Sequence, residues 1–324
     1  MKNIQKVLFI SALLLAFIFI DQSTGAASSR SSIDRNNAIC DAATQNPTPI
    51  PTPEITPTPT DTPTPTATPE PTVTPKTPSA KVRVGKKTKR INEINGKFIK
   101  KNGVIKFKTS SGKIYKKGFF LYRKHIYFAQ KKTGQLQRSW KKYKGNVYCF
   151  SRKDGHLYRS KKFEGVSIGK NGTAKSGKLN IARALTYTKA ASIAQRITSK
   201  NDSKSKKLYK CYKWVMRSPY VRHRTMKQMM KSKNWRKKWD IVFANDIFEK
   251  HSGCCVSYSA AFALLAKECG YKKVTLCCDT GHAWDDIGGR LYDPLFAHAR
   301  VFADNYNAKY KDYRINPAIT KKIS

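Results

Sequence analysis

The sequence predicts an α+β C-terminal domain that comes after a segment of β-hairpin repeats and a Pro/Thr-rich linker. Of the 32 residues in 47–78, 24 are proline or threonine, the composition of an extended linker. From residue 89 to residue 177, short apolar runs alternate with glycine-containing turns, which is the pattern of hairpins. After Gly177 the apolar residues recur at helical spacing and short strands come next, which is typical of an α+β domain.

Residues 1–26 have the order of a secretory signal peptide. Lys2 and Lys6 precede fourteen mostly apolar residues, and small residues come after them. A helix of that length spans about 21 Å. This is short of the ~30 Å hydrocarbon core, so a cleaved signal is favoured over a permanent membrane anchor. We therefore expect a secreted protein, cleaved after Ala26 or Ala27, without a transmembrane helix in the mature chain.

Two segments separate the signal from the repeats. Residues 27–46 form a short N-terminal segment, and residues 47–78 form an extended, polyproline-type linker. At ~3.1 Å per residue, the linker reaches roughly 100 Å. Its Thr-Pro alternation is also typical of O-glycosylated stalks. We expect the linker to hold the N-terminal segment apart from the hairpin repeats.

The residues after the linker carry a strong positive charge. Residues 80–324 contain 59 Lys or Arg and 14 Asp or Glu, a net charge of +45. The chain is 40% hydrophobic, which is enough for a packed core, so disorder is not implied. A surface of this charge attracts anionic partners. Specific nucleic-acid binding is disfavoured, because the charge is spread over the whole segment and no nucleic-acid motif occurs in this exported protein.

A register of 21 residues runs through the hairpin segment. Ile126-Tyr127 aligns with Val147-Tyr148, and a glycine comes after each pair at the same distance. A period of this length predicts stacked hairpins, since a single hairpin buries too little surface to be stable alone. The hairpin turns are predicted at residues 132–134 and 153–155, where turn-forming residues end in glycine.

The stretch from Trp140 to Ser160, WKKYKGNVYCFSRKDGHLYRS, resembles the cell-wall-binding repeats of Gram-positive surface proteins. That family includes the choline-binding repeats, whose aromatic cages hold a quaternary ammonium group between adjacent hairpins. The resemblance implies wall-binding aromatics, here Tyr127, Trp140, Tyr143 and Tyr148. Because the segment is densely cationic and has one tryptophan, we expect teichoic acid, another anionic glycopolymer or peptidoglycan as the partner rather than choline. A spacer with a solvated basic surface is the alternative.

Residues 179–324 are predicted to contain helices and then antiparallel strands. Helices are predicted at residues 180–198, 202–218, 240–250 and 254–270, the second capped by Asn201 or Asp202 and the last stopped by Gly270. Strands are predicted at residues 273–278, 282–287 and 290–293, with Gly288-Gly289 as the turn between the last two.

Three side chains in this segment form a candidate catalytic centre. A cysteine in the first turn of a helix, Cys254 or Cys255, has its thiolate stabilised by free backbone N–H groups and by the helix dipole. His282 is a candidate base, and Asp293 is a candidate to orient the imidazole. A two-glycine turn between their strands brings position 293 opposite about position 284, within reach of His282.

These residues resemble the transglutaminase-like superfamily of papain-fold enzymes. The family motif Gly-x-Cys-x-x-Tyr/Phe-Ala/Ser matches residues 253–259, and His-Ala-Trp matches residues 282–284. The family's Asp-Pro pair matches Asp293-Pro294, and the resemblance covers about residues 179–301. It implies that Cys254 occupies the variable position of the first motif. It also implies that the Cys255 backbone N–H contributes to the oxyanion hole.

The resemblance implies a triad of Cys255, His282 and Asp293 and an acyl-transfer reaction through a thioester on Cys255. With water as acceptor, the protein is a peptidase or amidase acting on a peptide or protein amide. With a lysine amine as acceptor, it is a cross-linking transglutaminase. Bacterial members of the family are often hydrolytic, so hydrolysis is slightly favoured. The alternative is a wall-binding adhesin or scaffold whose transglutaminase-like domain is catalytically silent.

The cysteines leave a further question open. Eight occur after the signal, and an even count in a secreted protein is compatible with disulfides. Their spacing shows no repeated framework, so no pairing is predicted. A structural zinc site is disfavoured because the sequence contains no Cys-x-x-Cys pair, and no cofactor is expected.

Overall fold

The computed structural model describes residues 77–324, except residues 280, 311–315 and 324. The predicted signal peptide, the short N-terminal segment and nearly all of the Pro/Thr-rich linker lie outside the described residues. The described part combines helices with antiparallel strands, which confirms the α+β prediction. In this part, no helix has both the length and the apolar character needed to cross a membrane.

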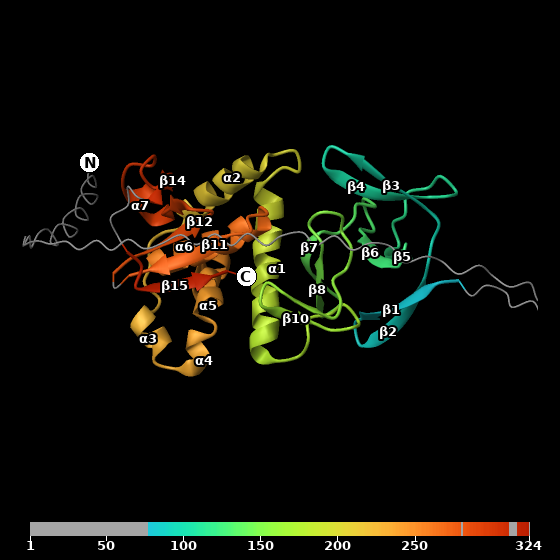
Figure 1. Cartoon of the computed structure of the whole chain (residues 1–324), viewed down its shortest axis with the longest axis horizontal. Helices are drawn as coiled ribbons and strands as arrows, with labels where there is room; N and C mark the ends of the chain where they lie inside the picture. Colours follow the sequence, from blue (N-terminus) through green and yellow to red (C-terminus); the bar gives the residue numbers. More distant parts are fainter. Residues whose placement is uncertain (1–76, 280, 311–315, 324) are drawn as a thin grey trace, which may run out of the picture. The chain divides into compact units, whose positions relative to one another are not determined.

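The strands of the repeat segment pair as successive antiparallel hairpins, so the predicted hairpin repeats are confirmed. The pairs are β1 (Ser79–Val84) with β2 (Lys87–Asn92), β3 (Gly96–Lys101) with β4 (Val104–Thr109), β5 (Gly118–Tyr122) with β6 (His125–Ala129), β7 (Ser139–Tyr143) with β8 (Asn146–Phe150), and β9 (Lys161–Phe163) with β10 (Val166–Ile168). The first hairpin begins before the predicted start at residue 89. The hairpins succeed one another towards α1 (Lys178–Ile197) (Figure 1).

The hairpin turns lie elsewhere than predicted. Arg123-Lys124 joins β5 to β6 and Lys144-Gly145 joins β7 to β8, and all four residues have positive φ. Two-residue turns of this conformation match the twist of the flanking strands. The predicted turns at 132–134 and 153–155 instead connect one hairpin to the next. The prediction was wrong because a turn within a hairpin and a connection between two hairpins have the same glycine-containing sequence pattern.

The connections between hairpins build the stack. After one glycine turn, the Leu136 N–H donates to the Ile105 carbonyl at 2.8 Å, and after the next, the Leu157 N–H donates to the Ile126 carbonyl at 2.7 Å. Each connection therefore ties its own hairpin to the preceding one. The side chains enclosed in this way form aromatic-rich cores that one two-stranded hairpin alone does not provide.

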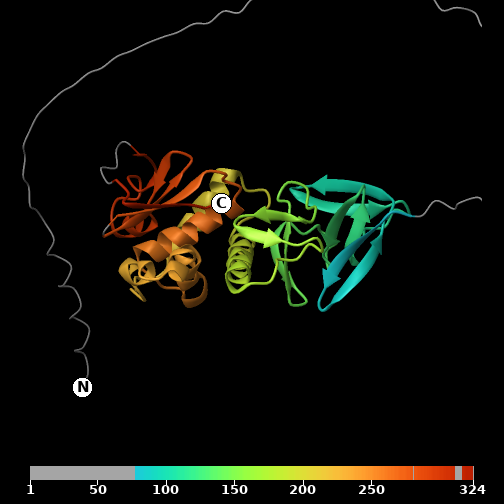
Figure 2. The same cartoon turned by 60° about the horizontal axis from the view of Figure 1, so that its bottom comes forward.

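The C-terminal part of the chain packs helices against an antiparallel sheet. The helices after α1 are α2 (Lys204–Met216), α3 (Met226–Met230), α4 (Lys233–Arg236), α5 (Trp239–Asn245), the π-helical η1 (Asp246–Lys250), α6 (Cys255–Glu268) and α7 (Pro294–Ala299). The sheet has the order β14-β13-β12-β11-β15, from β11 (Val274–Cys278), β12 (Ala283–Ile287), β13 (Arg290–Tyr292), β14 (Tyr306–Lys309) and β15 (Ile319–Lys322). Helix α6 lies against this sheet (Figure 2).

The predicted helices and strands of this part are present, with shifted ends. The cap of α2 is Ser203, whose Oγ accepts from the Lys206 N–H at 3.1 Å, and not Asn201 or Asp202. Asp202 instead forms an ion pair with Lys210 at 2.7 Å. The sequence pattern missed α3, α4, α7, β14 and β15, because elements this short are too brief to establish an apolar period.

Helix α6 occupies the centre of the core and positions the candidate site. It is buried from Cys255 to Lys267, as expected for a helix that is apolar on all sides. Its predicted stop is confirmed: Gly270 has φ +91°, its N–H donates to the Lys267 carbonyl, and the Tyr271 N–H donates to the Ala266 carbonyl. These bonds satisfy carbonyls that the helix end leaves without partners.

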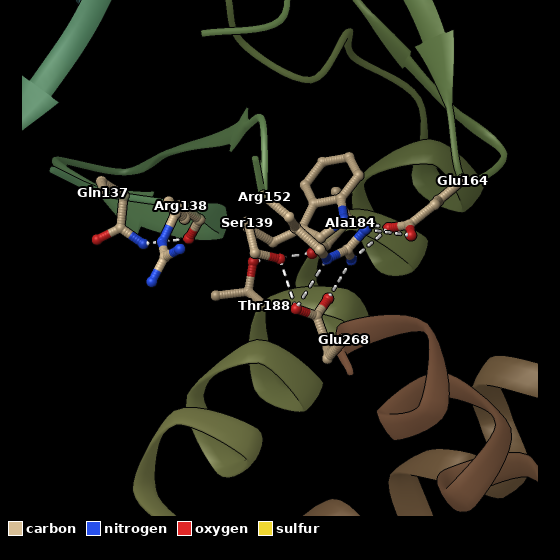
Figure 3. A network of polar contacts seen from close by, with 9 residues as sticks. Gln137, Arg138, Ser139, Arg152, Glu164, Ala184, Thr188 and Glu268 are labelled. Atoms are coloured by element: carbon tan, nitrogen blue, oxygen red, sulfur yellow. Dashed lines mark hydrogen bonds and ion pairs between the residues drawn. The ribbon is translucent and has the colours of Figure 1, made fainter. Parts of the chain in front are cut away.

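The hairpins and the helices share a hydrophobic core. Trp140 of β7 is buried and stacks on Tyr187 of α1, with ring centroids 5.8 Å apart. Close by, Arg152 bonds the carboxylates of Glu164 at 2.8 Å and Glu268 at 2.6 Å (Figure 3). Burial alone would lower the pKa of Arg152, but Glu268 and Glu164 raise it. Since Glu268 ends α6, the network anchors the helix whose first residue is the candidate nucleophile.

Replacing Arg152 by alanine is expected to destabilise the protein by about 3–5 kcal/mol, because two buried carboxylates lose their counter-charge. Burial raises the pKa of Glu268, so its protonated form is favoured in the folded state and stability is lost as pH rises through that pKa. The loss of unfolding free energy in Arg152→Ala, measured by urea titration, should therefore be smaller at pH 5 than at pH 8. Arg159→Ala, at an exposed arginine, is the control, and equal losses in both variants would contradict the role of the network.

Candidate active site

The candidate nucleophile stands at the start of a buried helix. Cys255 is the first residue of α6, and Cys254 is its N-cap. The Gly253 N–H donates to the Pro219 carbonyl at 3.2 Å, and the Gly253 carbonyl accepts from the Val221 N–H at 2.9 Å. A Cβ at Gly253 would lie 2.3 Å from a side-chain atom of the first helical turn. Glycine therefore lets the chain turn into the helix at this point.

The Cys255 sulfur lies against the loop that carries His282. Its distance to the Gly281 carbonyl oxygen is 4.0 Å. The loop is tight, because the His282 N–H donates to Asp279 Oδ1 at 2.5 Å and the Asp279 N–H donates to the His282 carbonyl at 3.0 Å. The imidazole stacks on Phe296 of α7, with centroids 3.8 Å apart and planes 11° from parallel. These contacts fix the orientation of the imidazole ring.

Asp293 lies where β13 ends and α7 begins. The strand register pairs Asp285 with Tyr292. The same register brings Asp293 opposite Trp284, the second residue after His282. Asp293 Oδ2 forms a hydrogen bond with His282 Nε2, and Oδ1 accepts from the Phe296 N–H at 3.0 Å as the N-cap of α7. The buried carboxylate thus holds the imidazole through Nε2 and caps α7.

The two adjacent thiols interact with each other. A hydrogen bond from Cys255 lowers the pKa of Cys254 to about 6, against the effect of burial. Donating that bond and being buried raise the pKa of Cys255. Of the two thiols, Cys255 is the one that lies against the His282 loop. By its position, Cys255 remains the candidate nucleophile.

The segment from Tyr220 to Arg222 borders the two thiols, although no sequence motif singles it out. The backbone of Tyr220 forms an isolated parallel β-bridge with Gly253. Arg222 Nη2 donates to the Tyr220 hydroxyl at 3.2 Å. Tyr220 raises the pKa of Arg222, and Cys254 and Cys255 add to this effect, so the guanidinium favours a thiolate. No spacing rule reveals this segment, because it joins the helix start through backbone pairing across a long stretch of sequence.

A second carboxyl group is buried near the triad. Burial, and then Asp293 and Asp286, raise the pKa of Asp285 well above its ordinary value. Its carboxyl oxygens have no hydrogen-bond partner among the described residues. Asp286, by contrast, accepts from the Gly289 N–H at 2.7 Å in the hairpin turn. Burial of the Asp285 carboxyl oxygens without a hydrogen-bond partner among the described residues favours the neutral form of this group.

The predicted wall-binding aromatics are mostly core residues. Tyr127, Trp140 and Tyr148 are at most 5% exposed, and Tyr143 alone of the four is partly exposed. The Trp140 indole N–H donates to Glu164 Oε2 at 2.6 Å, and the Tyr148 hydroxyl donates to the Arg83 carbonyl at 2.6 Å. The three buried rings present little surface to a ligand in this structure, and their part in wall binding stays a prediction. The rings instead stack the hairpins.

The hairpins present a cationic cleft of about 680 Å³, which we call the hairpin cleft. Its charged lining residues are Arg83, Lys161, Lys162, Lys170 and Lys175, and no carboxylate lines it among the described residues. The β9 lysines stand at its edge, where Lys161 Nζ lies 4.3 Å from the centroid of the Tyr158 ring. A cleft of this composition attracts phosphate or carboxylate groups.

No protein-family model matches the chain, and no curated protein matches it. Solved structures that match are choline-binding proteins. The choline-binding domain of Spr1274 from Streptococcus pneumoniae is 19% identical, with a TM-score of 0.23 over 25% of this chain and 95% of that chain. Choline-binding protein F from Streptococcus pneumoniae, in the presence of a peptidoglycan analogue, is 16% identical, with a TM-score of 0.24 over 31% of this chain and 34% of that chain.

CbpJ from Streptococcus pneumoniae is 17% identical, with a TM-score of 0.23 over 30% of this chain and 34% of that chain. The chain thus spans about a third of the length of the last two proteins. These likenesses assign no ligand to this chain. The transglutaminase-like resemblance rests on the sequence motifs, and the geometry of Cys255, His282 and Asp293 is compatible with it.

Proposed function

We propose that the chain is a secreted, wall-bound cysteine enzyme that cleaves or transfers at amide bonds. The observation that carries this proposal is the position of Cys255 at the start of α6, 4.0 Å from the carbonyl that precedes His282, together with the bond between His282 and Asp293. Cys255 begins α6, His282 precedes β12 and Asp293 caps α7, so the three candidate groups come from separate elements. This arrangement has the parts that nucleophilic acyl transfer needs.

In the proposed reaction, the Cys255 thiol gives its proton to His282 and the sulfur attacks the amide carbonyl carbon. The first residue of a helix has no carbonyl one turn earlier to accept from its N–H, so we propose that the Cys255 N–H donates to the oxyanion. The imidazolium then protonates the leaving amine, and an acyl thioester remains on Cys255. Water releases a carboxylic acid, or an amine forms a new amide, and either step restores the thiol. We favour water.

Attachment to the cell wall is the second half of the proposal, and charge supports it. Residues 80–324 carry a net charge of +45, and the hairpin cleft concentrates cations without a lining carboxylate among the described residues. The buried aromatics leave little ring surface for a choline cage. We therefore propose a polyanionic wall polymer, such as teichoic acid, as the partner of the hairpins.

Attachment of this kind should be broken by salt. The Debye length falls from ~10 Å at 0.1 M to ~3 Å at 1 M ionic strength, so molar NaCl is expected to release most of the protein from purified walls. Lys162→Gln/Lys170→Gln in the hairpin cleft should elute at lower NaCl than the unmodified chain. Elution is monitored by gel densitometry, with free choline as the parallel eluant. Release by choline at low salt, or equal binding to walls stripped of teichoic acid, would overturn the anionic partner.

A wall-binding protein with a silent catalytic domain is the second candidate. It is favoured by the burial of Cys255, which is 8% exposed, and by the raised pKa of its thiol. The decisive experiment incubates the protein with purified peptidoglycan and, separately, with a glutamine peptide and an amine, and it identifies products by mass spectrometry. New carboxyl or amide products support the enzyme. Their absence, together with wall binding, supports the scaffold.

A further inference from the structure

A second cleft, of about 640 Å³, lies where the hairpins meet the helices, and we call it the junction cleft. Connections between hairpins contribute Gln135 and Arg138 to one wall. The opposite wall contains Lys200, just after α1, and Lys207 of α2. The junction cleft is separate from the hairpin cleft, because no residue lines both. A ligand in it contacts both parts of the described chain.

The charge in the junction cleft is not balanced by the protein. Among the described residues, its one lining carboxylate is Glu268, which Arg152 bonds at 2.6 Å and to which the Ser139 hydroxyl donates at 2.5 Å. The remaining lining cations form no ion pair with a described residue; they are Arg138, Lys153, Lys200 and Lys207. The cleft therefore holds an excess of positive charge.

Arg138 is the least solvated of these cations. It is half-buried, and its Nη2 donates to the Gly103 carbonyl at 3.0 Å. In Figure 3 it lies apart from the carboxylates of Glu164 and Glu268. Burial lowers the pKa of Arg138, and burial together with Arg138 and Lys106 lowers the pKa of Lys200. The fold thus holds like charges close together, an arrangement that a bound anion would stabilise.

The rest of the lining fits a saccharide better than a bare ion. Gln135 brings an amide group to the hairpin wall, and Leu136 and Ala194 add apolar surface. The Gln137 amide is already bonded, because its Nε2 donates to the Arg138 carbonyl at 2.7 Å and its Oε1 accepts from Gln130 Nε2 at 3.4 Å. The Lys200 ammonium already donates to Gln135 Oε1, so amide and cation face the same space. A cavity of this size is in the range of small-molecule sites, and amides beside apolar patches suit the hydroxyls and ring faces of a sugar.

We propose that the junction cleft binds a phosphorylated sugar, with Arg138 and Lys200 holding the phosphate and the Gln135 amide nitrogen donating to a sugar hydroxyl. This site requires neither the triad nor wall attachment through the hairpin cleft. Glu268 lines the cleft and ends α6, so the ligand would sit at the far end of the helix that begins with Cys255.

The test is isothermal titration of the full chain with N-acetylglucosamine 1-phosphate, with inorganic phosphate and N-acetylglucosamine as separate probes. We expect the sugar phosphate to bind more tightly than either probe. Arg138→Gln/Lys200→Gln should weaken this binding at least about tenfold, because charge-assisted hydrogen bonds are lost. Lys97→Gln/Lys100→Gln removes the same charge from exposed positions of β3 that line neither cleft, and it should leave the binding unchanged.

Three outcomes would overturn the proposal: no binding of the sugar phosphate, equal weakening in both double variants, or equal affinity for inorganic phosphate. Thermal unfolding of each variant checks the fold, and Lys200→Gln alone keeps the bond from Arg138 to Gly103 intact. This single variant should still weaken binding measurably, and unchanged binding counts against the site. The result is independent of salt elution from walls, which the hairpin-cleft variant tests separately.

Discussion

Cys255→Ala is expected to abolish turnover of any amide substrate, with a loss of at least about 10³-fold in kcat, because no other group replaces a covalent nucleophile. Labelling of the active site by a thiol-directed electrophile should disappear with it. His282→Ala should have a similar effect, since it removes the base. Peptide mapping by mass spectrometry locates the labelled cysteine, which matters because the described cysteines are all buried and adjacent thiols are easily confused.

Cys254→Ala is the matched control for the nucleophile. It removes the neighbour that shares a hydrogen bond with Cys255 but leaves the thiol that lies against the His282 loop. We expect Cys254→Ala to retain at least part of the activity, with a changed pH profile because Cys255 then titrates without its partner. Activity in Cys255→Ala and none in Cys254→Ala would move the nucleophile by one residue.

Asp293→Asn should lower kcat by about 10²- to 10⁴-fold while leaving the protein folded. The neutral amide no longer fixes the tautomer of His282 or stabilises the imidazolium that forms during the reaction. Asparagine is a good N-cap, so the start of α7 should be kept. The measurements are kcat on the substrate found by mass spectrometry and the thermal midpoint of unfolding.

Asp293→Ala separates the two roles of this carboxylate. It loses the bond to His282 and also the cap bond from the Phe296 N–H. We expect it to match Asp293→Asn in activity but to be less stable by about 1 kcal/mol, the usual cost of losing an N-cap. An Asp293→Asn variant that keeps most of the activity would show that the carboxylate only caps α7.

Local pattern was enough for the elements and side chains of the candidate site. The buried helix that begins at a double cysteine and the hairpin closed by Gly288-Gly289 each depend on residues that are close together in the sequence. The turn length set the register that brings Asp293 to His282, as the pairing of Asp285 with Tyr292 shows. Such features are predictable because each depends on contacts within one element or between neighbouring elements.

Other features depended on contacts that sequence spacing does not record. The aromatics of the repeats were predicted to face a ligand, yet Trp140 packs on Tyr187 of α1 and Tyr148 bonds the Arg83 carbonyl. A ring suitable for binding a ligand is equally suitable for filling a core, and what decides is the neighbour it meets. The hairpin turns were misplaced for the same reason, because stacking decides which glycine turn lies inside a hairpin.

By itself, the sequence determined the α+β class, the stacked hairpins, the buried helix that begins at the double cysteine and the positive charge that favours an anionic partner. The tertiary structure alone decided where that charge is concentrated, in two clefts whose cations come from separate hairpins and helices. It also decided that Tyr220 and Arg222 border the thiols and that Arg152 joins the repeats to α6. The physical reason is that charge and burial are set by which distant segments pack together, whereas periodicity and turn chemistry are local.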